Sequence, residues 1–386
     1  MISDKRLIRL TQKILSFNSE NPPGNEFELS QFIEEDMRGL GLSVKVKSFE
    51  KGRPNVIATL KGALPRKQAQ KHSILITPHF DTVPIGKGWT RDPLGKDIVG
   101  DKIYGRGASD DKGNTAVCME VMRSLVEDGV QLNHDLIMAA TVDEETGSQK
   151  GIVPLLNEGI LKPGYALILD SDEYHAVIAQ KGLMHFRVKI FGKKAHGAYN
   201  WLGVNAVEIA SAVIAKLKTM KFEYKKHSLL RAPTLNIGTI RGGDKVNMVA
   251  DFCEFSVDMR FLPGTSHQKL LEKVKAVIAA HAKHFKIEID DVQQPYEIDP
   301  KHLFVKTYVD ELKAMRIRAG LKGSEGATVM TFFQKHRIPA FATGFGAHGT
   351  AHTTDEYARC SVIIKGARLL ERFLVRFDKH LLEGRS

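Results

Sequence analysis

The sequence of 386 residues contains only three cysteines and no long apolar run. Cys118, Cys253 and Cys360 are far apart and odd in number, which argues against a disulfide framework. None stands beside another metal-ligand residue, so we interpret each as a small buried apolar side chain. No apolar segment approaches the roughly 20 residues of a membrane span, and the charged N-terminus lacks a signal-peptide core. We therefore expect a cytoplasmic protein that binds no membrane.

The net charge of +11 is concentrated in Lys/Arg-rich stretches at residues 45–53, 61–71 and 216–226. We interpret these stretches as solvated faces and loops. The sequence has no recognition helix, zinc finger or aromatic ribonucleoprotein motif, so we expect no nucleic-acid partner. A positive field could still steer anionic substrates toward a cleft.

Strand-like and helix-like segments alternate along much of the chain. Hydrophobic content of 42% and charged content of 26% are those of a globular protein, and the length predicts two domains. Residues 73–77, 135–142 and 166–169 are apolar, with a helical pattern at 114–129 between the first two. This alternation predicts an α/β fold with a doubly wound, mostly parallel sheet, in which ligands gather at the carboxyl ends of strands.

The pattern changes near residue 181. Alternating segments at 184–191, 234–240 and 252–261 are interspersed with helical patterns, which predicts an inserted α+β domain of ferredoxin-like type. Helical periodicity resumes after Pro295 and Pro300. We therefore expect a catalytic domain of residues 1–180 and 293–386 and a second domain of residues 181–292.

Metal-ligand residues follow the predicted strands. His79 comes after the first apolar run, and Asp81 has its side chain on the same face, where a carboxylate can fix the tautomer of a ligating histidine. Asp143, Glu144 and Glu145 follow the second run and Asp170 the third. Adjacent glutamates point in different directions. One can therefore bind metal while the other accepts a proton from an attacking water whose pKa the metal lowers toward roughly 7.

Two further ligand candidates lie in loops. The glycine-rich segment 105–113 contains Asp110. A phosphate loop is the alternative there, but the order of residues does not match and two acids would repel phosphate. Asp110 as a carboxylate bridging two cations makes better electrostatic sense. In the late loop, His352 and His348 are equal candidates on the residues alone.

Taken in order, these segments resemble the metallopeptidase family of succinyl-diaminopimelate desuccinylase, acetylornithine deacetylase, aminoacylase and bacterial glutamate carboxypeptidase. The order is His-x-Asp, Gly-Arg-Gly-x-x-Asp-x-Lys-Gly, Glu-Glu, an acid, a lid Ala-His and a late His, from about residue 22 to 356. The resemblance implies two Zn²⁺ ions, for which Co²⁺ or Mn²⁺ could substitute. It favours His352 because acids follow it, and Asp170 over Asp172. It also implies a cis peptide bond after Asp110.

The resemblance assigns a role to each residue of the centre. His79 and Asp170 would bind one zinc, Glu145 and His352 the other, and Asp110 would bridge them. Glu144 would be the general base and later the proton donor, with Asp81 orienting His79.

The resemblance makes the inserted domain a lid and dimer interface. His196, in Lys194-Ala195-His196-Gly197, would reach the partner's active site and stabilise the oxyanion, with Asn247 assisting from the same lid. Arg260 would bind the substrate carboxylate. Thr328 lies in a segment that is near the substrate in members of the family. This segment departs from the family pattern: it has an acid at Glu325 and lacks the acid expected at Val329.

We therefore predict a homodimeric deacylase of amino-acid metabolism, acting on a small N-acyl amino acid or a short peptide with a free carboxylate. Hydroxide held by the metals, activated by Glu144, would attack the amide carbonyl. A dipeptidase or carboxypeptidase is the enzymatic alternative. A non-catalytic binding homologue is the alternative from another class. The acyl group and the preferred side chain stay open.

Overall fold

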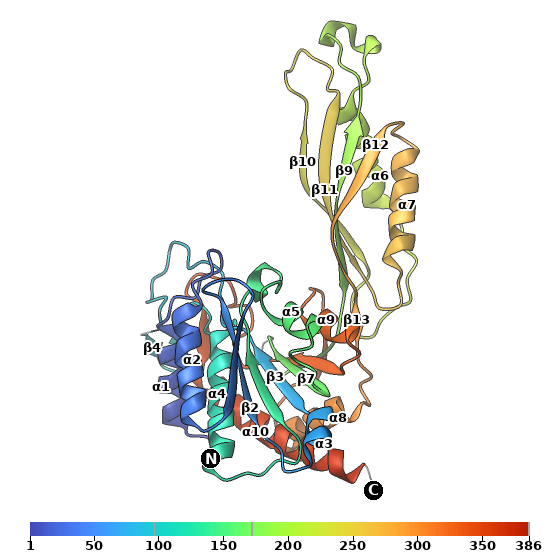
Figure 1. Cartoon of the computed structure of the whole chain (residues 1–386). Helices are drawn as coiled ribbons and strands as arrows, with labels where there is room; N and C mark the ends of the chain where they lie inside the picture. The colour runs from blue at the N-terminus through green and yellow to red at the C-terminus, as the bar shows by residue number, and fades with distance from the viewer. Residues whose placement is uncertain (96, 171–172, 385–386) are drawn as a thin grey trace. The chain divides into compact units, whose positions relative to one another are not determined.

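The computed structural model describes residues 1–95, 97–170 and 173–384. It divides into two compact units (Figure 1). Unit 1 contains Met1–Ile178, Ile298–Lys322 and Phe332–Ser386, and unit 2 contains Ala179–Glu297 and Gly323–Thr331. The segment 323–331, which we expected in the catalytic domain, groups with unit 2. No described helix is long and apolar enough to cross a membrane.

Unit 1 is built on a large mixed sheet. Its strands follow the order β1 (Ser43–Ser48), β2 (Pro54–Leu60), β6 (Leu136–Ala140), β3 (Ile74–Pro78), β7 (Tyr165–Leu169), β15 (Ala340–Thr343) and β8 (Ala176–Gln180). The central strands β6, β3, β7 and β15 are parallel, whereas β1, β2 and β8 pair antiparallel. Short strands β13 (Tyr296–Glu297) and β14 (Leu321–Ser324) also pair with β8. The predicted α/β fold with a large sheet, parallel at its centre, is confirmed.

Helices bury apolar stripes around this sheet. The main ones are α1 (Asp4–Leu15), α2 (Phe27–Gly39), α4 (Lys112–Glu127), α8 (Leu303–Ala314) and α10 (Cys360–Glu383). Helix α4 is buried along almost its whole length and contacts β3 and β6. Helix α10 buries Ile363, Leu370, Phe373 and Phe377 at helical spacing, which explains why an otherwise charged sequence is helical there.

Smaller elements complete unit 1. Helices α3 (Arg66–Lys71), α5 (Ile152–Asn157) and α9 (Met330–Lys335) are each six residues long. A three-stranded sheet joins β16 (Tyr357–Arg359), β5 (Lys102–Tyr104) and β4 (Ile98–Val99). Because β16 pairs with β5, the late loop that contains His352 lies beside the glycine-rich loop that contains Asp110.

Unit 2 has the βαββαβ order of a ferredoxin-like domain (Figure 1). The sheet order is β10 (Thr234–Gly242), β11 (Phe252–Phe261), β9 (Gly182–Phe191) and β12 (Phe285–Gln293), all antiparallel. Alternate residues of β9 and β11 are buried in one core with α6 (Ala206–Thr219) and α7 (His267–Ala279). The predicted separate α+β domain is therefore present.

Candidate metal centre

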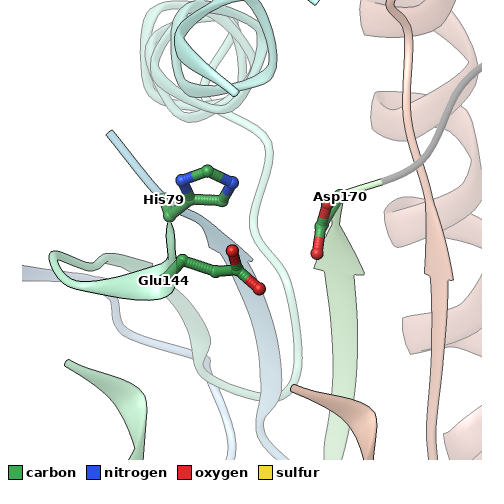
Figure 2. A group of neighbouring side chains, drawn as sticks. All are labelled: His79, Glu144 and Asp170. Carbon is green, nitrogen blue, oxygen red and sulfur yellow. The ribbon is translucent and has the colours of Figure 1, made fainter. Parts of the chain in front are cut away.

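Three neighbouring strands of unit 1 end in potential metal ligands. His79 follows β3 directly and Asp170 follows β7 directly, while Glu144 and Glu145 follow β6 after a short turn. Since β6, β3 and β7 are adjacent and parallel, their carboxyl ends meet at one edge of the sheet. Figure 2 shows the imidazole of His79 and the carboxylates of Glu144 and Asp170 facing one shared space. Potential donor atoms of these three side chains lie within 4.8 Å of one another.

A second group of donors comes from loops. Asp110, Glu145 and His352 also place one potential ligand atom each within 4.8 Å of one another. His352 Nε2 lies 3.1 Å from Glu145 Oε1 and 3.1 Å from Asp110 Oδ2. His348 belongs to neither group found among the described residues. Asp172, the other alternative, lies outside those residues.

The carboxylate of Asp110 connects the two groups. Its Oδ1 lies 3.0 Å from Nε2 of His79, and its Oδ2 lies 3.1 Å from Nε2 of His352. One carboxylate thus presents a different oxygen to each histidine, which is the geometry of a ligand shared by two cations. The Asp110–Asp111 peptide bond is cis, as the resemblance implies.

Glu356 holds the loop that carries Asp110. Its Oε1 accepts hydrogen bonds from the backbone amides of Ser109 at 2.9 Å and Asp110 at 3.1 Å, and its Oε2 accepts from Arg106 Nη1 at 2.7 Å. The Glu356 and Arg106 side chains are both buried. Gly107 has a φ of +88°, and a Cβ there would lie 2.8 Å from Thr82 Cγ2, so the loop needs glycine at this turn.

Asp81 orients both His79 and the glutamate pair. Its Oδ1 lies 3.3 Å from His79 Nδ1, which leaves Nε2 of that ring directed at Asp110. The same carboxylate accepts hydrogen bonds from the backbone amides of Glu144 at 3.1 Å and Glu145 at 3.2 Å. Asn21 Nδ2 donates to it at 2.8 Å. One buried acid therefore fixes the imidazole and the start of the glutamate turn together.

The electrostatics of the cluster suit a bound cation. Burial raises the pKa of Glu144 to about 7, with added repulsion from Asp110 and Glu145. Burial and the charges of Glu144 and Asp110 also raise the pKa of Asp170 well above its ordinary value. Crowded carboxylates in a buried place are stabilised by positive charge. Two imidazoles and four carboxylates form a nitrogen and oxygen donor set that Zn²⁺, Co²⁺ or Mn²⁺ accepts.

Four predicted site residues lie in unit 2. His196 and Asn247 are neighbours: His196 bridges to Met248, and Gly197 N donates to Asn247 O at 2.8 Å. His196 is exposed, and its Nδ1 accepts from Ala198 N at 3.1 Å. At the other end of β11, Arg260 forms a bidentate ion pair with Asp258.

Thr328 is the fourth predicted residue in unit 2. Its hydroxyl donates to Gln180 Oε1 at 2.8 Å. Glu325, the acid gained in this segment, pairs with the buried Lys181 and accepts from the Arg231 amide at 2.9 Å. Glu325, which departs from the family pattern, therefore forms contacts within unit 2.

Three supporting residues escaped the sequence analysis: Arg53, Glu26 and Asn21. All are buried, and all contact Asp143 or Asp81, or a residue bound to them. Glu26 begins the helical pattern of residues 26–41, whereas Asn21 and Arg53 lie outside any periodic segment. In each case the partner is distant in sequence. The signal that could have found Arg53 is its position directly before a strand within a stretch otherwise interpreted as surface.

A family comparison decides what kind of protein carries this centre. The model of peptidase family M20/M25/M40 matches residues 75–376. The chain belongs to this family. The matched residues include all five predicted metal ligands.

Individual relatives cover nearly the whole chain. Acetylornithine deacetylase of Proteus mirabilis is 26% identical over 385 residues, covering 96% of this chain and 95% of the relative. Aminopeptidase PepT of Bacillus cereus has a similar structure, with a TM-score of 0.83, 24% identity and coverage of 98% of this chain and 99% of that one. A tripeptidase of Staphylococcus aureus gives a TM-score of 0.81 at 22% identity, covering 98% and 100%. These structures support the fold.

Membership of this family, together with the two donor groups, identifies the M20 protein as a metal-dependent hydrolase. A dinuclear metal-binding M20 peptidase of Bacillus subtilis has the same fold, with a TM-score of 0.76 over 97% of this chain and 98% of that one, at 16% identity. The two donor groups of this chain fit two divalent cations.

Proposed function

We propose that this M20 protein is a dinuclear-zinc amidohydrolase that removes the acyl group from an N-acyl amino acid. The observation that carries the proposal is the carboxylate of Asp110, which presents one oxygen to His79 and the other to His352. The deacetylase of Proteus mirabilis, similar over nearly its whole length, supports an acylated amino acid as the substrate.

The metal ions would be held by the residues that converge in unit 1. His79 and Asp170 would bind one cation, Glu145 and His352 the other, and Asp110 both. When bound, two such cations lower the pKa of a water molecule toward roughly 7 and polarise the scissile carbonyl. Co²⁺ or Mn²⁺ would also fit these donors.

Glu144 would move the protons of the reaction. Its carboxylate lies in the group with His79 and Asp170, so a base would stand beside a water molecule held at these residues. Glu144 accepts a proton from that water as it attacks the amide carbon. It then donates the proton to the departing amine nitrogen, so that the amine leaves neutral. Asp81 keeps His79 in one orientation throughout.

Unit 2 would complete the site of a second subunit. His196 Nδ1 accepts a hydrogen bond, so the ring proton is on Nε2 and can stabilise an oxyanion. Arg260 has two of its nitrogens on Asp258 and keeps Nη1 for a substrate carboxylate. His196 and Arg260 are separated by nearly the length of β11, roughly 25 Å. One copy of unit 2 cannot place both on one small substrate, which favours His196 and Asn247 acting on the partner's site.

An exposed apolar surface supports dimerisation through unit 2. Tyr199 and Trp201 stack edge to face, and Trp201 is 71% exposed. Further exposed apolar side chains lie in the paired segments 191–204 and 246–252: Phe191, Leu202, Val204, Val246 and Phe252. Such a concentration of apolar side chains on a surface is typical of an interface with another protein. We propose a homodimer formed through this surface.

One experiment separates the candidate activities. The purified protein is assayed for bound metal and for hydrolysis of N-acetyl and N-succinyl amino acids, dipeptides and tripeptides, with and without chelator. Chelator-sensitive release of an acyl group from the first class supports the deacylase. Turnover confined to peptides would replace it with a peptidase of the same family. Metal binding without any hydrolysis would identify a non-catalytic binding homologue.

A further inference from the structure

A cavity opens in unit 1, at the edge of the sheet opposite to the metal centre. Its volume is about 460 Å³. It is bordered by residues at the beginnings of the parallel strands: Ser73 precedes β3, Asp135 precedes β6, and Lys162 precedes β7. The metal ligands follow the carboxyl ends of the same strands. Five-residue strands separate the two places by roughly 16 Å.

The floor of this cavity is one face of the sheet. Ser43 pairs with Thr59, and Thr59 with Ile137, while Lys45 pairs with Ile57, so all five share a face. Helix α2 packs against β1 and β2. Because Ser43 and Lys45 are exposed, α2 must cover the other face. The floor thus combines apolar side chains with hydroxyl groups and is open to solvent.

The walls of the cavity are strongly cationic. Six cationic side chains and a single carboxylate line it, the cations being Lys45, Lys61, Arg66, Lys67, Lys71 and Lys162. Helix α3 supplies three of them, and its Lys67 and Lys71 are four residues apart and so lie on the same side of the helix. Two Lys/Arg-rich stretches whose composition is typical of solvated surface, 45–53 and 61–71, therefore converge on one hollow.

Most of this charge has no ion-pair partner among the residues that the structure describes. Arg66 Nη1 lies 2.5 Å from Asp135 Oδ2, and Asp135 Oδ1 also accepts from Gly62 N at 2.9 Å. None of the five lysines forms an ion pair with another residue that the structure describes. Like charges that line one hollow repel one another. Bound anionic groups would remove that repulsion.

We propose that this cavity binds a small phosphorylated molecule of the nucleotide class. Its volume falls in the range of small-molecule pockets, roughly 300–1,000 Å³. Lysines bind phosphate oxygens as point charges, and several can reach one polyphosphate. Within the apolar part of the lining, Ile57 and Leu161 are buried, whereas the half-buried Ile137 and Ile160 offer a surface for a planar base. A nucleic acid would need cations along an extended track, whereas these surround a single hollow.

Isothermal titration of the metal-loaded protein with ATP and Mg²⁺ at physiological salt tests this proposal. We expect one saturable site. The double variant Lys67→Gln/Lys71→Gln should weaken ATP binding by about tenfold or more, because it removes two charge-assisted contacts. The matched control Lys216→Gln/Lys218→Gln removes the same charge from exposed positions on α6 and should bind ATP like the unaltered protein. Unchanged hydrolase activity shows that both variants are folded.

The remaining outcomes would overturn the proposal. Absence of saturable ATP binding, or equal weakening in both double variants, would mean that the cavity is no specific site. If tripolyphosphate binds as tightly as ATP, the apolar floor makes no contribution to binding. The ligand would then not be of the nucleotide class. A single-stranded oligonucleotide that binds more tightly than ATP at equal phosphate concentration would indicate a nucleic-acid surface instead.

Discussion

Arg53 donates a hydrogen bond from Nη1 to Oδ1 of Asp143 at 3.0 Å, with both side chains buried. Its Nε lies 3.0 Å from Oε2 of Glu26. Asp143 has a φ of 70°, and its side chain also accepts from Thr146 Oγ1 at 2.7 Å. Arg53 directly precedes β2, and its guanidinium thus connects the acidic turn before Glu144 to Glu26 at the start of α2.

This relationship predicts that Arg53→Met destabilises the protein much more than the same substitution of an exposed arginine. Removing the cation leaves two buried carboxylates uncompensated, which costs about 3–5 kcal/mol. Arg38→Met is the control, because Arg38 pairs with Glu34 on the surface of α2 and such pairs contribute about 0.5 kcal/mol. Urea denaturation measures both. Equal free energies of unfolding for the two variants would contradict a structural role for Arg53.

The different roles proposed for Glu144, as the base, and Glu145, as a metal ligand, give a second prediction. Glu144→Gln should keep both metal ions and lower kcat by about 10²- to 10⁴-fold, because only the proton-transferring group is lost. Glu145→Gln should bind fewer metal ions, because it removes a charged ligand. Metal analysis alongside kinetics distinguishes the two variants. Loss of metal from Glu144→Gln, or turnover close to that of the unaltered enzyme, would refute its assignment as the base.

The strand-end residues could be predicted because their signal is local. A short apolar run followed by His79 or Asp170 marks both a buried strand and the edge where it ends. Asp110 and His352 lie in irregular loops, so their roles followed from the order of motifs rather than from any local pattern. Their proximity depends on the pairing of β5 with β16, two three-residue strands that were not predicted.

The supporting residues and the cationic cavity could not be predicted for a different reason. Arg53 lies 90 residues from Asp143, and Arg106 lies 250 from Glu356, so no sequence window contains both partners. Lys67 and Lys71 belong to a stretch that looks like solvated surface. Only the short helix α3 and the register of β1 and β2 bring that stretch over a hollow.

A third prediction concerns stability in acid. Burial alone would raise the pKa of Glu311, but Arg376 and Arg372 donate hydrogen bonds to its carboxylate and hold the pKa below its ordinary value. Because the folded-state pKa lies below the unfolded-state value of roughly 4.3, the charged form stabilises the fold above that pH. This contribution is lost as pH falls through the folded-state pKa.

Glu311→Gln should therefore be less stable than the unaltered protein at pH 7, and the difference should shrink below about pH 4. Urea denaturation over a series of pH values measures it. A difference that is constant from pH 7 to pH 3 would show that the loss comes from packing rather than from the charge that Arg372 and Arg376 stabilise.

We propose above that His196 acts on the active site of the partner subunit. This predicts that two inactive variants can complement each other in a mixed dimer. His196→Ala should retain metal and lower kcat by about 10²- to 10³-fold, as loss of an oxyanion donor does. Mixed with Glu144→Gln and allowed to exchange subunits, it should regain activity. In the mixed dimer, the subunit with intact Glu144 receives an intact His196 from its partner, so one of the two sites has every group.

The matched control is a mixture of Glu144→Gln and Glu145→Gln. Both residues belong to the site of their own subunit. Each of the two sites in a mixed dimer therefore has one defect, and no activity should return. Native mass spectrometry of the same samples measures how much mixed dimer has formed. If mixed dimers form and the His196→Ala mixture stays inactive, His196 does not act across the subunit boundary. If only monomers are present, the proposed dimer is refuted, and with it the action of His196 on the partner's site.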